Sequence, residues 1–296
     1  MHEDQVPVSP QVVGQLVAEQ FPQWARLPVR AVQTAATVNS IFLIGQGLAA
    51  RFPLRAQSPR RAREELLVEA AAARELAKVS PLPTPEPVAI GEPGHGYPLP
   101  WSVQTWLPGR DATIEDPAGS ITFAEDLAGL LTSLRAADTG GRHFEGQGRG
   151  GHLPDHDAWM HTCLHHSEGL LDVTRLRVMW AELRALPEVD ADVMSHTDLT
   201  PPNMLVTEGR LAGVLDGGGF APADPALDLV AAWHLLDHAP RERLRELLGC
   251  HEVQWKRGMA WAFQQAMGLV WYYAQTNPTM SQWGRRTLRR LLSETD

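Results

Sequence analysis

Residues 195–228 read SHTDLTPPNMLVTEGRLAGVLDGGGFAPADPALD and are the most informative part of the sequence. It holds a His-x-Asp that ends at Asp198, then Asn203 five residues later, then a glycine turn between two apolar runs, and Asp216 at the end of the second run. Polar side chains on a loop that leads into a strand gather where strand ends meet. Carboxylate and amide oxygens gathered in this way can hold a hard cation. A further carboxylate is then available to orient an attacking hydroxyl.

Upstream of this stretch, the first third of the chain combines short β-forming runs with helical runs. A polar residue followed by proline, which is a helix start signal, occurs at Ser9-Pro10 and again at Ser58-Pro59. Gly45-Gln46-Gly47 is typical of a tight turn. The pattern predicts strands at 29–34, 40–44, 48–52, 87–90 and 101–106, a helix that begins at residue 10, and a helix over 59–78.

Pro108-Gly109 marks the expected boundary between a lobe of residues 1–108 and a lobe of residues 109–296. Apolar periodicity makes the second lobe mainly helical, apart from the β-rich stretch quoted above. Residues 139–154 are rich in glycine and have no apolar period, so we expect a surface loop there. Helices are predicted over 123–137, 156–170 and 174–186, and from Pro225 almost to the end of the chain.

Acidic residues outnumber basic ones, and nearly all the basic residues are arginines. The 296 residues include 26 lysines and arginines against 35 acidic residues, for a net charge of -9. Lys78 and Lys256 are the only lysines, so a mechanism that needs a lysine elsewhere is excluded. The acidic balance argues against a nucleic-acid partner, which requires a basic face, and is compatible with a cationic ligand.

The cysteines and the apolar runs predict where the protein works. Cys163 and Cys250 are the only cysteines, which favours a reducing compartment without a disulfide framework. The initial MHEDQVPVSP lacks the basic and apolar regions of a signal peptide. No apolar run reaches the roughly 18 residues of a membrane span. We therefore expect a cytoplasmic protein with no membrane partner.

The segment HTDLTPPN, residues 196–203, resembles the H-x-D-x-x-x-x-N motif of the aminoglycoside phosphotransferase family, small-molecule kinases related in fold to protein kinases. LDGGG and PADPALDLVAAW resemble the two segments that follow in that family. FPQWARLPVR, PTPEPVAIGEPGHGYPLPWSVQTWLPG and WYYAQTNP extend the likeness over nearly the whole chain. The resemblance implies an α+β, two-lobed, protein-kinase-like fold with a small antiparallel-sheet N-lobe that binds nucleotide. Its mainly helical C-lobe would carry the catalytic loop and the substrate site.

The resemblance also implies roles for residues of this chain. Asp198 matches the catalytic aspartate, which accepts the proton of the substrate hydroxyl and aims that oxygen at the γ-phosphate. Asn203 and Asp216 match the magnesium ligands, and Mg²⁺ prefers such oxygen ligands. His196 is expected to orient the loop, and Asp224 and Asp228 to support it or to cap the next helix.

The nucleotide site implied by the resemblance lies in the N-lobe. Family members hold the phosphates with a basic residue on the third strand, and here that position points to Arg51, with Glu69 on the following helix as its partner. Arginine stays charged and grips phosphate in bidentate fashion. The loop of residues 35–40 is expected to cover the triphosphate and the segment 104–107 to meet adenine. The cofactor-binding residues named in these segments are Thr37, Asn39, Ser40, Gln104 and Trp106.

Two departures from the family pattern bear on turnover. Thr197 stands where the family most often has glycine, and Gly217 follows the metal aspartate where a bulky residue is common. A run of three glycines after Asp216 could loosen the metal ligand. His161, Cys163 and His165 invite a zinc site, but no H-E-x-x-H or C-x-x-C pattern supports it.

The function expected from the sequence is ATP- or GTP-dependent phosphorylation, with Mg²⁺, of a hydroxyl on a small molecule. The expected acceptor is an antibiotic such as an aminoglycoside or another natural product, and the protein is expected to be a monomer or a homodimer. A metabolic kinase for an amino sugar, a choline-like alcohol or homoserine is an alternative. A nucleotide-binding protein with little transfer activity is another. A protein-serine kinase is less favoured, because no activation segment separates Asp216 from Asp224.

Overall fold

The computed structural model of the chain describes residues 6–32, 39–146, 149–188 and 190–294. The chain forms two compact units. The first comprises Met1–Lys78, Pro83–Pro108 and Leu215–Gly219, and the second comprises Val79–Leu82, Gly109–Val214 and Phe220–Asp296. The loop that contains Asp216 therefore belongs to the first unit, although it comes late in the sequence.

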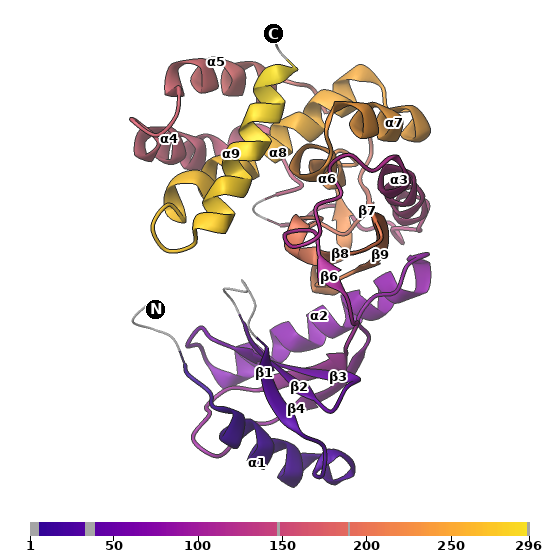
Figure 1. Cartoon of the computed structure of the whole chain (residues 1–296), viewed down its shortest axis with the longest axis vertical. Coiled ribbons are helices and arrows are strands. Elements are labelled where there is room, and N and C mark those ends of the chain that lie inside the picture. The colour runs from indigo at the N-terminus through magenta and orange to yellow at the C-terminus, as the bar shows by residue number, and fades with distance from the viewer. Residues whose placement is uncertain (1–5, 33–38, 147–148, 189, 295–296) are drawn as a thin grey trace. The chain divides into compact units, whose positions relative to one another are not determined.

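The first unit is built on a five-stranded antiparallel sheet of order β1-β2-β3-β5-β4 (Figure 1). Gly45, at φ 65°, opens the turn between β2 and β3, in the left-handed region that glycine adopts without cost. The short 3₁₀ helix Pro22–Trp24 precedes the first strand. The strands are β1 (Val29–Val32), β2 (Asn39–Ile44), β3 (Leu48–Pro53), β4 (Pro87–Gly91) and β5 (Trp101–Thr105).

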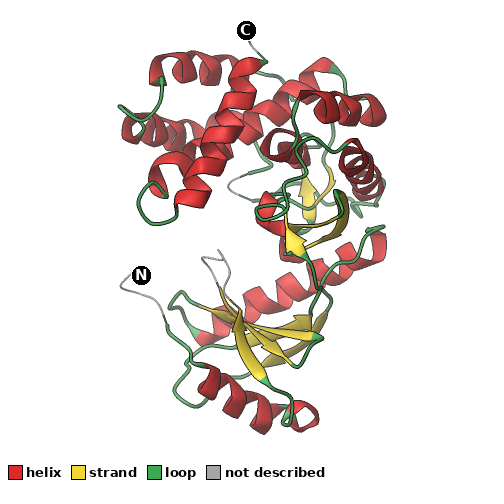
Figure 2. Cartoon of the chain, viewed as in Figure 1, coloured by secondary structure: helices red, strands yellow, loops and turns green. Residues whose placement is uncertain are grey.

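Two helices flank this sheet, one on each side (Figure 2). Helix α1 (Pro10–Gln20) begins where it is predicted, because the Ser9 side chain accepts a hydrogen bond from the Val12 amide. It buries Val13, Leu16 and Val17 against sheet residues that include Phe52 and Trp101, whose rings stack 4.8 Å apart. Helix α2 (Pro59–Val79) lies on the other side.

The second unit is mainly helical, as predicted, and α8 is its central element. Twelve of the 21 residues of α8 are buried, among them Trp261. Trp233 is also fully buried, as expected for a core tryptophan, whereas Trp271 is half-buried. The helices are α3 (Ile121–Arg135), α4 (Asp157–His166), α5 (Val173–Leu183), α6 (Val230–Leu235), α7 (His238–Leu248), α8 (Glu252–Tyr272) and α9 (Pro278–Ser293).

Two small antiparallel sheets carry the loops of interest in the second unit. β8 (Met204–Thr207) pairs with β6 (Arg110–Asp111) and β9 (Arg210–Val214), and β7 (Val193–Ser195) pairs with β10 (Ala221–Ala223). The sequence did not predict β6 or β10, because both are too short for an alternating pattern and β10 contains a proline. Helix α4 ends at His166, earlier than predicted, and Gly169 at φ 77° follows it.

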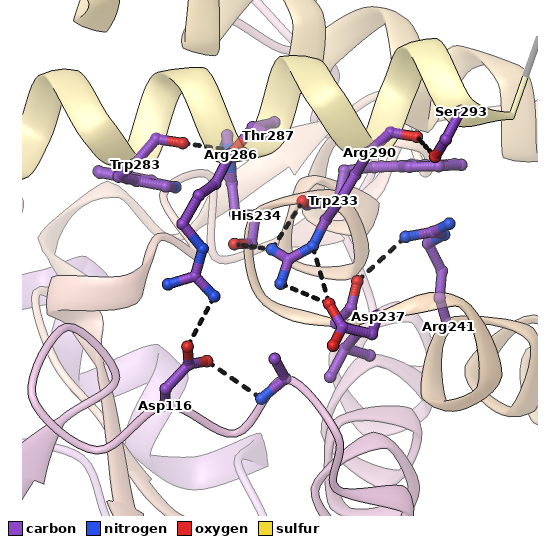
Figure 3. Close-up of polar contacts among 12 residues, drawn as sticks. Asp116, Trp233, His234, Asp237, Arg241, Trp283, Arg286, Thr287, Arg290 and Ser293 are labelled. Atoms are coloured by element: carbon purple, nitrogen blue, oxygen red, sulfur yellow. Dashed lines mark hydrogen bonds and ion pairs between the residues drawn. The ribbon is translucent and has the colours of Figure 1, made fainter.

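Arginines of α9 fasten this helix to the rest of the second unit (Figure 3). Arg290 donates to the Asp237 carboxylate at 2.9 Å and to the His234 carbonyl at 2.7 Å, and Arg286 donates to Asp116 at 2.6 Å. Burial lowers the pKa of Arg290 below its ordinary value. No helix among the described residues is long and apolar enough to cross a membrane.

Candidate active site

The predicted catalytic loop runs from the end of β7 to the start of β8. Its last three residues form a short 3₁₀ helix, Pro201–Asn203. This turn brings the Asn203 side chain back over Asp198, and its amide nitrogen donates to the Asp198 carbonyl at 3.0 Å and to the Asp198 Oδ2 atom at 2.8 Å. The five-residue spacing therefore brings the candidate base and a candidate metal ligand into direct contact.

Asp228 supports this loop from beneath. Its Oδ2 atom accepts a hydrogen bond from the His196 amide at 2.7 Å, and its Oδ1 atom accepts one from the Thr197 amide at 3.0 Å. The side chain lies in the interior, and burial raises the pKa of Asp228 while the His196 charge and these amide donors lower it. Asp228 was expected either to support the loop of Asp198 or to cap the next helix. Its hydrogen bonds to the His196 and Thr197 amides agree with the first role.

Thr197 adopts a strained backbone in this loop. Its φ is 71°, in the left-handed region that is an outlier for a β-branched residue. Glycine, the more frequent residue of the family at this position, adopts that conformation without strain. The hydrogen bond from its own amide to Asp228 holds the strained residue in place.

A second donor, a cation, reaches the carboxylate of the candidate base from the glycine-rich segment. Arg149 donates through Nη1 to the Asp198 Oδ1 atom at 2.9 Å. The sequence predicted only a surface loop here, and no spacing or periodicity in that segment distinguishes Arg149 from the other arginines.

Asp224, shortly before Asp228, forms a buried ion pair with α8. Its Oδ2 atom accepts hydrogen bonds from Arg257 at 2.5 and 2.9 Å and from the Trp261 indole at 2.8 Å. Asp224 and Arg257 also line a cavity of about 230 Å³. Three further carboxylates line it, those of Glu188, Asp190 and Asp192, together with Phe144, Gly150, Gly151 and His152.

Arg51, the predicted phosphate clamp, contacts two carboxylates of the first unit. Its Nη2 atom lies 2.7 Å from the Asp216 Oδ1 atom, and its Nη1 atom lies 3.8 Å from the Glu69 Oε2 atom. Glu64 and Glu65, which share the helix with Glu69, pair with Arg60 and Arg61 instead. Burial raises the pKa of Glu69, and the charge of Arg51 opposes that rise. The geometry thus selects Glu69 among the three glutamates as the neighbour of Arg51.

The glycine run after Asp216 lies against helix α2. Gly217–Gly219 form a short 3₁₀ helix. A Cβ atom on Gly217 would lie 2.4 Å from the Leu76 Cδ2 atom, and one on Gly218 would lie 3.1 Å from the Glu69 side chain. A side chain at Gly217 would therefore have to displace Leu76 of α2, and one at Gly218 would crowd Glu69. Asp216 itself has φ 59°, a strained conformation for a residue with a side chain.

The remaining predicted nucleotide residues are placed as follows. Thr37 lies outside the described residues. Asn39 and Ser40 begin strand β2 and pair with Pro53 and Phe52. Ser40 therefore starts the predicted strand, whereas Asn39, expected in the loop of residues 35–40, also belongs to the strand because the β2–β3 ladder continues through it. Gln104 lines a pocket with Arg51 and Glu69. The Trp106 amide donates to the Gly47 carbonyl at 2.9 Å, so this donor is already used by the protein.

The candidate metal ligands suit Mg²⁺ by their chemistry. The amide nitrogen of Asn203 is used by Asp198, which leaves its amide oxygen, and no described residue donates to that oxygen. Asp216 offers a carboxylate whose Oδ2 atom likewise accepts no hydrogen bond from the described part of the chain. Both are oxygen ligands of the kind that Mg²⁺ prefers.

In the histidine-rich helix α4, His166 and Cys163 pack against other residues of the second unit. The His166 ring stacks on Trp271 with centroids 4.4 Å apart, and Cys163 is fully buried. Burial raises the pKa of Cys163 to about 11, so this thiol stays protonated at neutral pH. Both observations give these side chains a packing role in the second unit.

Comparison with known proteins identifies the family. The sequence model of the Phosphotransferase enzyme family matches residues 35–261, so the chain belongs to this family. No curated protein matches the sequence.

Solved structures of similar fold include antibiotic phosphotransferases. The GDP complex of wild-type aminoglycoside 2'-phosphotransferase-IIIa is 16% identical with a TM-score of 0.71, over 97% of this chain and 100% of that chain. Macrolide 2'-phosphotransferase MphH from Brachybacterium faecium is 18% identical with a TM-score of 0.62, over 94% and 98%. ADP-bound aminoglycoside phosphotransferase APH(2'')-Ib is 14% identical with a TM-score of 0.62, over 96% and 99%.

These findings confirm the predicted fold class. The chain has a two-lobed protein-kinase-like fold, with an antiparallel sheet in the N-lobe and a mainly helical C-lobe. It is a phosphotransferase by family.

Proposed function

We propose that the protein transfers the γ-phosphoryl group of ATP or GTP to a hydroxyl of an antibiotic and thereby confers resistance to it. The observation that carries the proposal is the contact between Asn203 and Asp198 in a loop fastened by Asp228. The names of the similar structures support the substrate class, since they include complexes with kanamycin, gentamicin and streptomycin and two macrolide phosphotransferases.

In this mechanism Asp198 acts as the general base. Its carboxylate accepts the proton of the substrate hydroxyl as that oxygen forms a bond to the γ-phosphorus. The bond between the γ-phosphorus and the bridging oxygen breaks, and the nucleoside diphosphate leaves. Such a reaction needs little covalent help from the protein, so the main task of Asp198 is to position the hydroxyl. Asn203 fixes the orientation of the carboxylate.

The residues of the nucleotide site have binding roles in the proposal. Asn203 and Asp216 would hold Mg²⁺, which neutralises phosphate charge when bound. Arg51 would grip the nucleotide phosphates, with Glu69 keeping its guanidinium in position, and must release the Asp216 oxygen that it now holds. Gln104 and Trp106 would lie at the base, and the loop with Thr37 would cover the phosphates with Asn39 and Ser40 at its end.

The charge of the second unit favours a cationic acceptor. Besides the Asp224–Arg257 ion pair, the carboxylates of Glu188, Asp190 and Asp192 line the cavity of about 230 Å³. Gly150 of the glycine-rich segment lines it too. The neighbouring Arg149 contacts Asp198, so the cavity lies close to the candidate base. Aminoglycosides carry several ammonium groups, which carboxylates bind well.

The test is product formation from ATP and from GTP, with Mg²⁺, on kanamycin, gentamicin, streptomycin and a macrolide. Mass spectrometry detects the added phosphate. Asp198→Asn should lower kcat by about 10²- to 10⁴-fold, as expected for loss of a general base. Asp155→Asn is the matched control, because Asp155 belongs to the same unit and its side chain is 78% exposed. An Asp198→Asn enzyme as fast as the wild type contradicts the mechanism.

The alternatives are separated in the same assay. An amino sugar, choline and homoserine join the panel, and a clear preference for one of them would replace the antibiotic by a metabolic acceptor. Nucleotide binding without product on any acceptor would favour a binding protein. Arg51→Ala should raise the KM for nucleotide, because it removes the proposed phosphate clamp, and an unchanged KM would mean that another residue grips the phosphates.

A further inference from the structure

We propose that Arg149, in the glycine-rich segment, is a positioning residue for the general base. The inference rests on the proposed role of Asp198. Arg149 donates to the Asp198 Oδ1 atom at 2.9 Å, while Asn203 donates to the Oδ2 atom at 2.8 Å. The two oxygens are thus held by separate donors from separate segments.

This arrangement fixes the carboxylate without consuming it. One donor alone leaves the carboxylate free to rotate about its last torsion, whereas donors on both oxygens define its plane. Each carboxylate oxygen has two acceptor positions, so a substrate hydroxyl still finds an acceptor beside Arg149 or Asn203. A base held in this way spends most of its time in the orientation that accepts the proton. Catalytic groups need neighbouring residues that hold them in such a geometry.

The position of Arg149 is set by the buried ion pair next to it in space. The carbonyl of Gly150 accepts a hydrogen bond from the Asp224 amide at 3.0 Å. Gly150 has φ 102°, and a Cβ atom there would lie 2.9 Å from the Ala223 Cβ atom, so only glycine fits this approach. Asp224 is held in turn by Arg257 and Trp261 of α8. The backbone beside Arg149 is therefore anchored to the core of the unit.

Stability alone does not account for the contact. The side chains of Arg149 and Asp198 are 40% and 35% exposed, and ion pairs of such exposure contribute at most about 1 kcal/mol to folding. Arginine keeps its charge at every working pH, so the contact persists while Asp198 is ionised. Arg149 can thus be removed without unfolding the protein, and its loss should appear in the rate.

The experiment compares Arg149→Ala with Arg184→Ala in the full-length enzyme. Arg184 pairs with Asp157 at 2.6 Å in the same unit, with side chains 35% and 44% exposed, which makes it a matched control. The assay uses the drug of the kanamycin, gentamicin, streptomycin and macrolide panel that reacts fastest. Arg149→Ala should lower kcat by about 10- to 100-fold, the cost of a misplaced catalytic group, and leave the KM for nucleotide unchanged. Arg149→Lys should recover part of the rate, and added guanidinium at millimolar concentration should recover part of it in Arg149→Ala.

A double variant separates this inference from the proposed function. If Arg149 acts through Asp198, the change Arg149→Ala should cost nothing further in an Asp198→Asn background; an equal loss in both backgrounds overturns the positioning role. An Asp198→Asn enzyme with wild-type kcat overturns the proposed function itself. If Asp198→Asn is impaired but Arg149→Ala is as fast as Arg184→Ala, only the present inference fails.

A measurement without substrate gives an independent check. Backbone amides of residues 196–203 should exchange with solvent faster in Arg149→Ala than in the wild type, because one of the two anchors of Asp198 is gone. Arg184→Ala should leave their exchange unchanged. Equal exchange in the two variants would contradict the inference even if no acceptor in the panel reacted.

Discussion

Two aspartate-bearing loops of this molecule are held in contrasting ways. Thr197, before Asp198, and Asp216 both have positive φ, at 71° and 59°. In the catalytic loop, the strain is held by a buried carboxylate, that of Asp228, through two backbone amides. In the loop of Asp216, the carboxylate forms one ion pair with a described residue, Arg51, and the Asp216 side chain is 48% exposed.

The difference matches what each loop is proposed to do. A general base works best in one fixed orientation, and hydrogen bonds to a buried acceptor are hard to displace. A metal ligand must exchange its partner when nucleotide and Mg²⁺ arrive, and a partly exposed ion pair is weak enough to allow that. The packing of Gly217 against Leu76 then keeps the backbone of this second loop in place while the side chain changes partner.

Asp228→Ala should have the largest effect, because it leaves two buried amides without an acceptor. At about 1–3 kcal/mol for each, the free energy of unfolding should fall by about 2–6 kcal/mol, with a large loss of kcat. Urea denaturation measures the change, and Asp155→Ala is the exposed control. Asp228→Asn keeps one acceptor oxygen and should fall between Asp228→Ala and the wild type. A loss no greater than that of Asp155→Ala would remove the contrast between the loops.

Gly217→Ala should disturb the other loop by overpacking. Its Cβ atom would meet the Leu76 side chain at 2.4 Å, and the displacement should cost about 1–3 kcal/mol of stability and weaken nucleotide binding. Leu76→Ala makes room, so the double variant should be more stable than the sum of the two single changes predicts. Strict additivity in urea denaturation would show that the glycine run is loose after all.

The stability of the protein should also depend on pH through His234, which is buried in the second unit. Burial lowers the pKa of His234 from its ordinary 6.5 to about 3. Between these two pH values the imidazole is therefore protonated in the unfolded chain and neutral in the folded chain. Stability should therefore fall as pH drops below about 6.5, by about 2 kcal/mol at pH 5 from this group. His234→Gln should flatten that part of the profile. His165→Gln changes a side chain that is 71% exposed and should leave the slope as it is.

Thr197→Gly should have the smallest effect, and it should be favourable. Glycine relieves the left-handed strain at φ 71° but has more freedom to lose on folding, so the net gain should be at most about 1 kcal/mol. Thr200→Gly is the contrasting control, because Thr200 has an ordinary φ of -106° and should lose about 1 kcal/mol on the same change. Equal losses at the two positions would mean that Thr197 is not strained.

Much of the site was accessible from the sequence because its members are close along the chain or follow a regular pattern. Asp198 and Asn203 share one short loop that matches the family motif. The family resemblance assigned a basic residue to the third strand and an acid to the next helix, and the β-β-β-α order placed Arg51 and Glu69 there. These residues are in contact as the pattern indicates. The five strands of the first unit were predicted for the same reason, since each carries enough residues to show an alternation.

The features that the sequence did not predict depend on contacts between residues that are far apart along the chain. Arg149 is 49 residues from Asp198 and lies in a segment without periodicity, so no local rule points to it. The role of Gly217 in packing depends on Leu76, far away in the sequence. Asn39 was placed in the loop that the family resemblance implies over the triphosphate, yet strand pairing with β3 extends through it.

The use of arginine at position 51 has a consequence for chemical reagents. Lys78 and Lys256 are the only lysines of the chain, and neither lines the pocket that contains Arg51. Amine-reactive probes built to acylate the phosphate-binding lysine of a kinase would find no amine at the clamp proposed for Arg51. A dicarbonyl such as phenylglyoxal, which attacks guanidinium groups, would find one, and bound nucleotide should shield it. The enzyme would thus resist lysine-directed inhibitors while remaining open to arginine-directed ones.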